Sequence, residues 1–264
     1  MAASPRPVAL VTGAARRLGR AMALDLAAHG FDVAVHYRGS QADAQDTVAE
    51  LQALGAQAHA FQADLSDEAV CRALVPAVAA HFKRLDAVVN SASTFEHDDP
   101  ASFTVAAMEK HWRANTAPAC LLAQALHAYL DGCAEEWAKG GGCVVNLLDQ
   151  KLWNPNPDYF SYTLSKAALQ AATVMLAQAL APRVRVCGVA PGVTLVSGPM
   201  SADEFAAAHK MTPLERSSTP EDIARAVRFL IESPAITGTT LLVDGGQHLA
   251  AQSRDVLYLA QKNS

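Results

Sequence analysis

Cysteine is scarce in this sequence. Its five copies are an odd number, scattered along 264 residues without a Cys-x-x-Cys pair. This pattern predicts neither a disulfide framework nor a zinc site, and buried free thiols are the better interpretation. We therefore expect no metal site.

Long apolar runs and long basic runs are also missing. No stretch of about eighteen apolar residues is present, so no helix should cross a bilayer. The first residues lack the basic start and apolar block of a secretory signal. A net charge of −5 gives no electrostatic reason to expect nucleic acid or an anionic membrane as partner. We expect a globular cytoplasmic protein whose partner is a small-molecule substrate.

Short runs rich in β-branched residues alternate with helical patterns along the chain. The predicted strands are Val8–Thr12, Phe31–His36, Ala58–Ala63, Leu85–Asn90, Cys143–Leu148, Val184–Ala190 and Thr239–Val243. The predicted helices are Leu18–His29, Gln41–Leu54, Ser66–Phe82, Met108–Leu130, Tyr159–Ala181 and Pro220–Ile231. Such alternation implies parallel strands with right-handed crossovers. The predicted fold class is α/β, a single-domain doubly wound (Rossmann) parallel sheet of about seven strands with helices on both faces.

The whole chain, residues 1–264, should form one domain, since no linker or repeat interrupts it. The pattern loosens over Gly192–Thr219, which is long for a plain connection. This region is either a substrate lid or a surface loop without a function.

A glycine-containing turn follows the first predicted strand and reads T-G-A-A-R-R-L-G from Thr12 to Gly19. At the first strand-to-helix junction of a doubly wound sheet, glycine lets the backbone approach a pyrophosphate, and the helix N-terminus attracts it. We predict dinucleotide binding here, with a plain turn as the alternative. The predicted contacts are Gly13, Arg17, Leu18 and Gly19.

The end of the second strand indicates which dinucleotide binds. An NAD site usually has an acidic residue there, whereas the 2′-phosphate of NADP needs positive charge and hydrogen-bond donors. The residues present are His36, Tyr37, Arg38 and Ser40. Asp32 lies at the wrong end of the strand, and Arg17 adds a second cation. Because guanidinium groups bind phosphate in bidentate fashion, NADP(H) is favoured over NAD(H), although Arg38 could be a solvated loop cation.

Two residues after the third strand complete the predicted cofactor site. Asp64 could accept a hydrogen bond from the adenine amino group, or it could cap the next helix. Leu65 lies beside it.

Tyr162 and Lys166 are four residues apart in a predicted helix, so both side chains project from one face. A nearby ammonium lowers the pKa of a phenol, which would make Tyr162 a proton donor or acceptor near neutral pH. The alternative is a solvated helix face.

Several motifs together resemble the short-chain dehydrogenase/reductase family over nearly the whole chain. In chain order they are the Thr-Gly turn, Asn90-Ser91-Ala92-Ser93, Asn115, Tyr162 with Lys166, and Pro191-Gly192. By this resemblance, Asn90, Pro191 and Gly192 contact the cofactor. Asn115 would hold a water that connects Lys166 to solvent, unless it only kinks or packs its helix. The resemblance also implies a homotetramer formed through the helices Met108–Leu130 and Tyr159–Ala181.

Two departures from the common family pattern resemble the pteridine reductases within it. Arg17 replaces the middle glycine of the turn, and Asp149 replaces the catalytic serine thirteen residues before Tyr162. The resemblance implies that Phe95 stacks on a pterin ring and that Ser93 touches cofactor phosphate or substrate. It also implies that Tyr159 lines the pocket. One difference is Ser91, where this subgroup usually has a second asparagine.

Asp149 also has a chemical interpretation of its own. An ionised carboxylate would repel the alkoxide that forms when a ketone is reduced. Reduction of a ring C=N bond instead sends a proton to nitrogen, and a carboxyl paired with Tyr162 can relay it. Burial would raise the pKa of Asp149 and Lys166 would lower it, and the sequence leaves open which effect is larger. A structural cap is the alternative role.

We therefore predict an NADPH-dependent reductase of a pterin, dihydropterin or dihydrofolate-type ring. The predicted catalytic residues are Asp149, Tyr162, Lys166 and Asn115, and the predicted substrate contacts are Ser93, Phe95, Asp149, Tyr159 and Tyr162. The alternatives are a carbonyl reductase of 3-oxoacyl thioesters and a noncatalytic NADP(H)-binding sensor. Segments Gly192–Thr219 and Lys151–Asn156 are expected to select among pterins.

Overall fold

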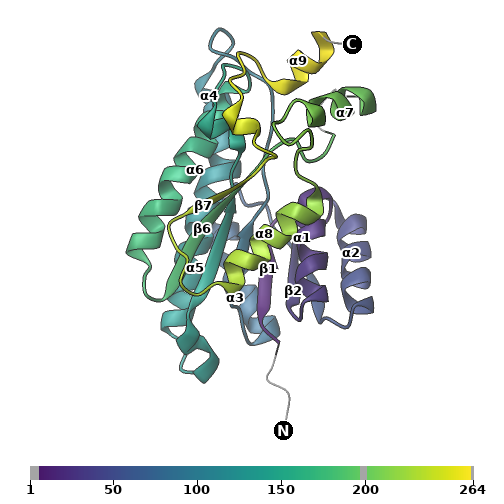
Figure 1. Ribbon diagram of the computed structural model, residues 1–264. Helices are drawn as coiled ribbons and strands as arrows, with labels where there is room; N and C mark the ends of the chain where they lie inside the picture. The colour runs from purple at the N-terminus through teal and green to yellow at the C-terminus, as the bar shows by residue number, and fades with distance from the viewer. Residues whose placement is uncertain (1–5, 197–200, 263–264) are drawn as a thin grey trace.

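The computed structural model describes residues 6–196 and 201–262, and it contains a parallel sheet of seven strands (Figure 1). The strands are β1 Val8–Val11, β2 Asp32–Tyr37, β3 Ala58–Gln62, β4 Ala87–Asn90, β5 Gly142–Leu147, β6 Val184–Pro191 and β7 Thr240–Val243. Their order across the sheet is β3-β2-β1-β4-β5-β6-β7, and every neighbouring pair is parallel. The predicted fold class is confirmed.

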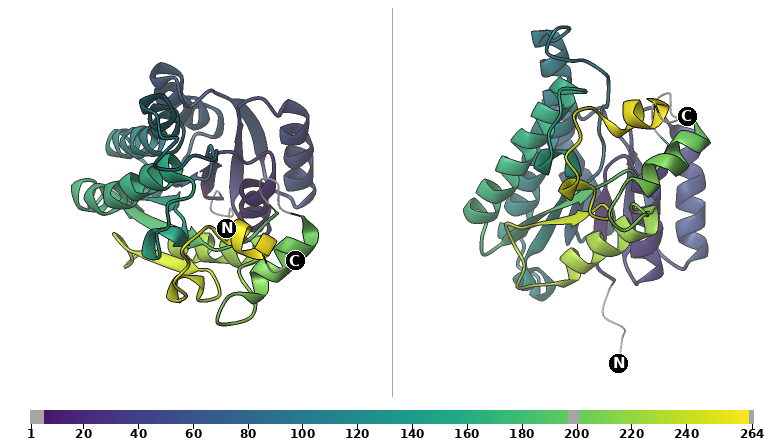
Figure 2. Two further views of the ribbon diagram at one scale, coloured as in Figure 1. Left: turned by 90° about the horizontal axis from the view of Figure 1, so that it is seen from above. Right: turned by 45° about the horizontal axis from the view of Figure 1, so that its top comes forward.

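Helices cover both faces of this sheet, as the view from above in Figure 2 shows. The α-helices are α1 Arg17–Ala28, α2 Gln41–Ala53, α3 Glu68–Phe82, α4 Val105–His111, α5 Ala117–Asp131, α6 Phe160–Ala179, α7 Ala202–Lys210, α8 Pro220–Glu232 and α9 Val256–Lys262. Successive residues of β1 point to opposite faces, so Ala9 and Val11 pack with α1, α2 and α8, whereas Val8 and Leu10 pack with α3 and α5. Both faces of the sheet are therefore buried, which explains its continuous apolar runs.

The predicted helix Met108–Leu130 is divided in the structure. A π-helical turn, η1 Trp112–Thr116, separates α4 from α5. Pro118 in the first turn of α5 has no N–H to donate, which fits a change of hydrogen-bond register at this point. Asn115 lies within the π turn.

The start of α3 also differs from the prediction. Asp67 caps this helix, because its carboxylate accepts the N–H of Val70. Ser66, where the predicted helix begins, instead donates both its N–H and its hydroxyl to Asp64. Asp64 is therefore not the helix cap either.

Two helices, α7 and α9, lie in regions where no helix was predicted. Helix α7 forms part of the region Gly192–Thr219 and begins with a capping box of Ser201 and Glu204. Helix α9 forms from the C-terminal tail and packs on α7 through Val256 and Leu257, at the upper right of Figure 1. Within the two described segments, no helix is long and apolar enough to cross a membrane.

Helix α3 offers a matched test of the core. Val78 is fully buried, whereas Val70 on the same helix is 39% exposed. We expect Val78→Ala to lower the free energy of unfolding by roughly 2 kcal/mol, because it removes buried methyl groups and leaves a cavity. Val70→Ala should change it by less than about 0.5 kcal/mol. Urea denaturation of the two variants measures the difference, and equal losses would contradict this packing.

Candidate active site

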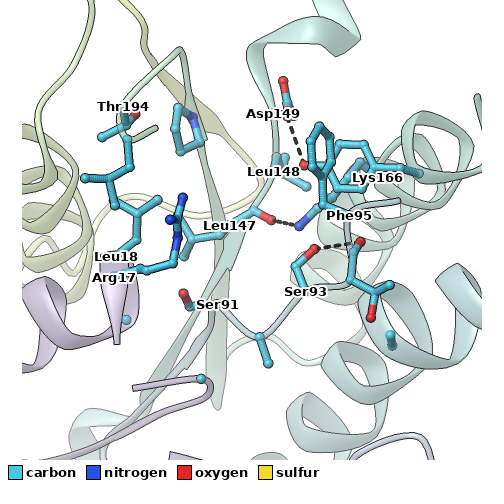
Figure 3. A pocket seen from close by; sticks show the side chains of 18 of the residues that line it. Arg17, Leu18, Ser91, Ser93, Phe95, Leu147, Leu148, Asp149, Lys166 and Thr194 are labelled. Atoms are coloured by element: carbon cyan, nitrogen blue, oxygen red, sulfur yellow. Dashed lines mark hydrogen bonds between the residues drawn. The ribbon is translucent and has the colours of Figure 1, made fainter. Parts of the chain in front are cut away.

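A cavity of about 810 Å³ opens at the carboxyl ends of the strands and brings most of the predicted site residues together. In Figure 3, Arg17, Leu18 and Thr194 lie on one side of it and Asp149, Lys166 and Phe95 on the other. The predicted residues that line it are Gly13, Arg17, Leu18, Gly19, His36, Tyr37, Arg38, Ser40, Asp64, Leu65, Ser93, Phe95, Asp149, Tyr159, Tyr162, Lys166, Pro191 and Gly192.

The glycine turn needs its glycines for two separate reasons. Gly13 has a φ of +67°, a conformation that disfavours other residues. A Cβ atom on Gly19 would overlap the carbonyl oxygen of Gly13, so the first turn of α1 could not pack against the turn. The resulting surface is backbone at the N-terminus of α1, which suits an anion.

His36 supports this turn and does not present a charge to a ligand. The buried ring accepts the N–H of Gly13 through Nδ1 (3.1 Å), and Nε2 lies 3.1 Å from the carbonyl oxygen of Ala63. Burial lowers the pKa of His36, so the ring is neutral near pH 7. His36 lines the cavity as a neutral side chain, and its contact with the cofactor stays a prediction.

Arginines surround the turn, and the sequence prediction missed one of them. Arg16 donates to the Ser40 hydroxyl (2.5 Å) and lies 3.5 Å from the Asp43 carboxylate. The adjacent Arg17 donates to the carbonyl of Val196 (2.9 Å), at the start of the predicted lid region. The paired arginines of the turn motif were the available signal for Arg16.

Asp32, by contrast, is remote from the end of β2 where a ribose would bind. It begins the strand, accepts the N–H of Gln57 (2.8 Å) and pairs with Arg6 (3.3 Å). This confirms that it lies at the wrong end for an NAD site.

The proposed catalytic side chains meet at the end of β5. The hydroxyl of Tyr162 donates to Oδ2 of Asp149 (2.9 Å), and Oδ1 of Asp149 accepts the N–H of Lys151 (2.9 Å). The ammonium of Lys166 donates to the carbonyl of Leu147, the last residue of β5 (2.7 Å).

The start of α6 fixes Tyr162 in this position. Tyr159 precedes the helix with a φ of +53°, which turns the chain sharply into it. The buried Asp98 carboxylate accepts the N–H of Ser161 (2.9 Å) and also its hydroxyl. A side chain from the β4–α4 connection thus supplies the cap that Tyr159 does not provide.

Burial controls the proton affinities in this group. It raises the pKa of Asp149, and burial followed by the negative charge of Asp149 raises the pKa of Tyr162 well above 10. The prediction that Lys166 lowers the pKa of Tyr162 is therefore wrong, because its ammonium is directed at Leu147 and lies 5.7 Å from the centre of the phenol ring. Burial also lowers the pKa of Lys166 to about 8. Asp149 thus holds a proton more readily than an ordinary aspartate.

An aromatic wall adjoins this group. Phe95 stacks on Tyr159 with the ring centres 4.1 Å apart and meets the Tyr162 ring edge-on at 4.7 Å. Phe95 is 41% exposed, whereas Tyr159 is buried. The wall therefore offers one exposed aromatic surface to the cavity.

Two predicted site residues do not line the cavity. Asn90 donates to the side chain of Asn146 (2.9 Å) inside the molecule, so its predicted contact with cofactor is not supported. Asn115 donates to Thr94 and Ser165 (both 3.0 Å) and accepts the N–H of Thr94 (2.7 Å). Its packing role is the alternative that the structure favours.

A family model described as enoyl-(acyl carrier protein) reductase matches residues 13–248. The chain belongs to the short-chain dehydrogenase/reductase family. Its members include the FolM alternative dihydrofolate reductase 1 of Brucella suis, solved in complex with NADP, which is 38% identical. That alignment covers 95% of this chain and 98% of the other, with a TM-score of 0.86.

Two further relatives differ in their reported activity. Pteridine reductase 1 of Leishmania tarentolae is 34% identical over 94% of this chain and 99% of its own length. A protein of Streptomyces violaceoruber described as ketoacyl reductase 2 of the granaticin polyketide synthase is 36% identical over 92% of this chain and 96% of its own. This chain is therefore an oxidoreductase of the short-chain dehydrogenase/reductase family.

In this family member the C-terminal segment also lines the cavity, which the sequence analysis missed. Gln252, Asp255, Val256 and Leu257 all contribute to it. No motif marks these residues, and their position depends on long-range contacts: Asp255 pairs with Lys151, and Val256 and Leu257 pack on α7.

The raised pKa of Asp149 makes a prediction about stability. In the folded state the carboxyl keeps its proton at pH values where the unfolded chain has lost it, so stability falls as the pH rises through this range. We expect Asp149→Asn to be more stable than wild type at pH 8 and to lose this advantage below about pH 4. Thermal unfolding across this pH range measures the difference.

Asp158 is the control for this prediction. Burial raises its pKa, but hydrogen bonds from Arg254 and from the N–H of Asp255 outweigh burial and lower it overall. Asp158→Asn should therefore be less stable than wild type at pH 8, with the gap closing in acid. If both variants were more stable than wild type at pH 8, or both less stable, the assigned directions of the two pKa shifts would be contradicted.

Proposed function

We propose that this reductase transfers hydride from NADPH to a C=N bond of a pterin-type ring, in a dihydropterin or dihydrofolate. The observation that carries the proposal is the hydrogen bond between the buried Tyr162 and the half-buried Asp149 on the cavity wall. The proposal also depends on the charge of this pair, on the cofactor site and on the aromatic wall of the cavity.

The charge of Asp149 discriminates between acceptors. A ketone oxygen is too weakly basic to take a proton from a carboxyl before hydride arrives, whereas the nitrogen of a ring C=N bond can take one. Reduction of a C=N bond needs a proton on nitrogen, and a carboxyl whose pKa is raised by burial holds one. The Asp149–Tyr162 pair thus favours a ring nitrogen as the proton acceptor.

The cofactor is NADP(H), and the residues present fit it. The backbone turn at Gly13 and Gly19 would receive the pyrophosphate, and Arg16, Arg38 and Ser40 would hold the 2′-phosphate. When bound, the cofactor supplies the hydride. The NADP complex of the Brucella suis relative supports this assignment.

The remaining side chains of the site would bind the cofactor and orient the substrate. Lys166 uses one of its three N–H groups on Leu147, and the others would bind ribose hydroxyls. Phe95 offers its exposed face to a flat ring, and Ser93 lies at the edge of the same wall. Tyr162 and Asp149 together hold the proton beside that wall. The lid function of region Gly192–Thr219 and the tetramer stay predictions.

Reduction of a 3-oxoacyl thioester is the second candidate, and the similarity to the Streptomyces ketoacyl reductase favours it. The position of Asp149 argues against it for the reason given above. A noncatalytic NADP(H) sensor is disfavoured because Tyr162 and Lys166 are both retained.

NADPH oxidation with dihydrobiopterin, dihydrofolate and an acetoacetyl thioester tests the proposal. We expect turnover of the pterin-type substrates, and Asp149→Ser should lower their kcat/KM by about 10² to 10⁴. Asp46→Ser, on the exposed face of α2, should leave kcat/KM unchanged. Turnover of the thioester alone would reject the pterin assignment, and NADPH binding without any turnover would favour the sensor.

Arg38 provides a separate test of cofactor choice. This exposed arginine lines the cavity at the end of β2. We expect Arg38→Ala to weaken NADPH binding about 10- to 100-fold, because a charge-assisted contact with phosphate is lost, and to change NADH binding by less than about twofold. Fluorescence titration of both cofactors measures this.

Arg72→Ala is the control, since Arg72 pairs with Glu68 on α3 and does not line the cavity. Equal weakening of NADPH and NADH binding in Arg38→Ala would show that the residue does not read the 2′-phosphate.

A further inference from the structure

A cluster of charged side chains connects the catalytic turn with the C-terminal segment. Lys151, buried two residues after Asp149, donates to the main-chain carbonyl of Asp158 (2.5 Å) and pairs with the Asp255 carboxylate (3.3 Å). The Asp158 carboxylate accepts Nε of Arg254 (2.8 Å) and the N–H of Asp255 (2.7 Å). These contacts fix Asp255 on the cavity wall beside the catalytic group.

We propose that Asp255 is a positioning residue for the proton donor: the C-terminal segment brings its carboxylate to the buried Lys151 ammonium, which would otherwise hold Asp149 ionised. This inference rests on the proposed role of Asp149 as the proton donor. It gives a function to a tail whose sequence carries no motif.

The geometry requires a partner for Lys151. Its side chain is only 5% exposed, and a buried ammonium that lacks a counter-ion is strongly destabilising. Asp149 is the nearest carboxyl along the chain, and the N–H of Lys151 already donates to it. Without Asp255, the ammonium would therefore stabilise the ionised form of Asp149, and a proton donor would be lost.

The electrostatic effects on Asp149 agree with this geometry. Burial is the main cause of its raised pKa, the negative charge of Asp255 raises that pKa further, and the positive charge of Lys151 lowers it. Asp255 acts in the same direction on Tyr162. The two members of the ion pair thus oppose each other at the catalytic carboxyl.

A capping role alone does not account for Asp255. Its Oδ1 accepts the N–H of Leu257 (3.2 Å) in the first turn of α9, which is an ordinary local contact. Its Oδ2 is the atom that faces Lys151, 104 residues earlier in the chain. Oδ2 of Asp255 therefore interacts with the active site and not with α9.

Other ionisable groups around the catalytic pair come from several elements and stay unchanged in the test. They are Lys166 on α6, Tyr159 and Asp158 before it, His111 on α4, whose ring lies 6.3 Å from that of Tyr162, and Arg254 before α9.

A double-mutant cycle that neutralises each charge of the ion pair tests the proposal on the full-length protein without cofactor or substrate. The probe is carbon-13 NMR of aspartate carboxyl groups, with the Asp149 signal assigned from Asp149→Asn. In Asp255→Asn, which keeps an acceptor for Leu257, the Asp149 titration should move to lower pH by about half a unit or more. In Lys151→Met it should move to higher pH, and in the double variant it should return close to wild type.

The opposite directions separate positioning from a structural role, which would disturb both single variants alike. Unchanged titration in Asp255→Asn, or shifts of the same sign in both variants, would overturn the proposal. Asp255→Asn alone decides it if Lys151→Met does not fold. Opposite shifts in a protein that does not reduce dihydropterins would uphold the ion pair and reject the pterin function. In an active enzyme, the alkaline limit of kcat should move to lower pH in Asp255→Asn.

Discussion

The hydrogen bond between the buried Tyr162 and the half-buried Asp149 depends on limited access of water, and the surrounding structure maintains this environment. A carboxyl away from water is costly unless its oxygens accept hydrogen bonds, and here the Tyr162 hydroxyl and the Lys151 N–H supply them. The two donors come from different elements, so the end of β5 and the start of α6 must keep a fixed separation. Lys166 contributes to this by bonding the last residue of β5 from within α6. A small shift of α6 would therefore break two hydrogen bonds together, that of Tyr162 with Asp149 and that of Lys166 with the last residue of β5.

The parallel sheet determines which segments can contribute to such a site. Strands β1, β4, β5 and β6 are neighbours, so the segments after them meet at one edge although they are far apart in sequence. Gly13, Ser93, Asp149 and Gly192 each come from one of these segments and line a single cavity. Cofactor and substrate surfaces thus adjoin because of strand order, which is the usual consequence of a doubly wound topology.

The sequence predicts the strands and the principal site residues because their signals are local. β-Branched runs and the four-residue spacing of Tyr162 and Lys166 need no knowledge of distant contacts. The rise in the pKa of Tyr162 was not predictable in this way, because it depends on burial and on the hydrogen bond from the Lys166 ammonium to the carbonyl of Leu147. The same limit applies to Asn90, whose partner Asn146 lies 56 residues away, and to α9, whose packing residues come from α7. Residues that are distant in the sequence determine each of these three features.

Overall similarity does not separate the two candidate reactions, because a ketoacyl reductase and a pteridine reductase match this chain at 36% and 34% identity. The choice between acceptors is a matter of local charge. An oxygen that gains negative charge is best stabilised by a neutral hydrogen-bond donor with no negative charge nearby. A ring nitrogen, by contrast, can take its proton from a carboxyl that becomes ionised on giving it up. We propose that Asp149 provides the second arrangement, and that burial together with Asp255 favours its protonated form against the field of Lys151. The proposed reduction of a C=N bond therefore depends on the environment of one carboxyl.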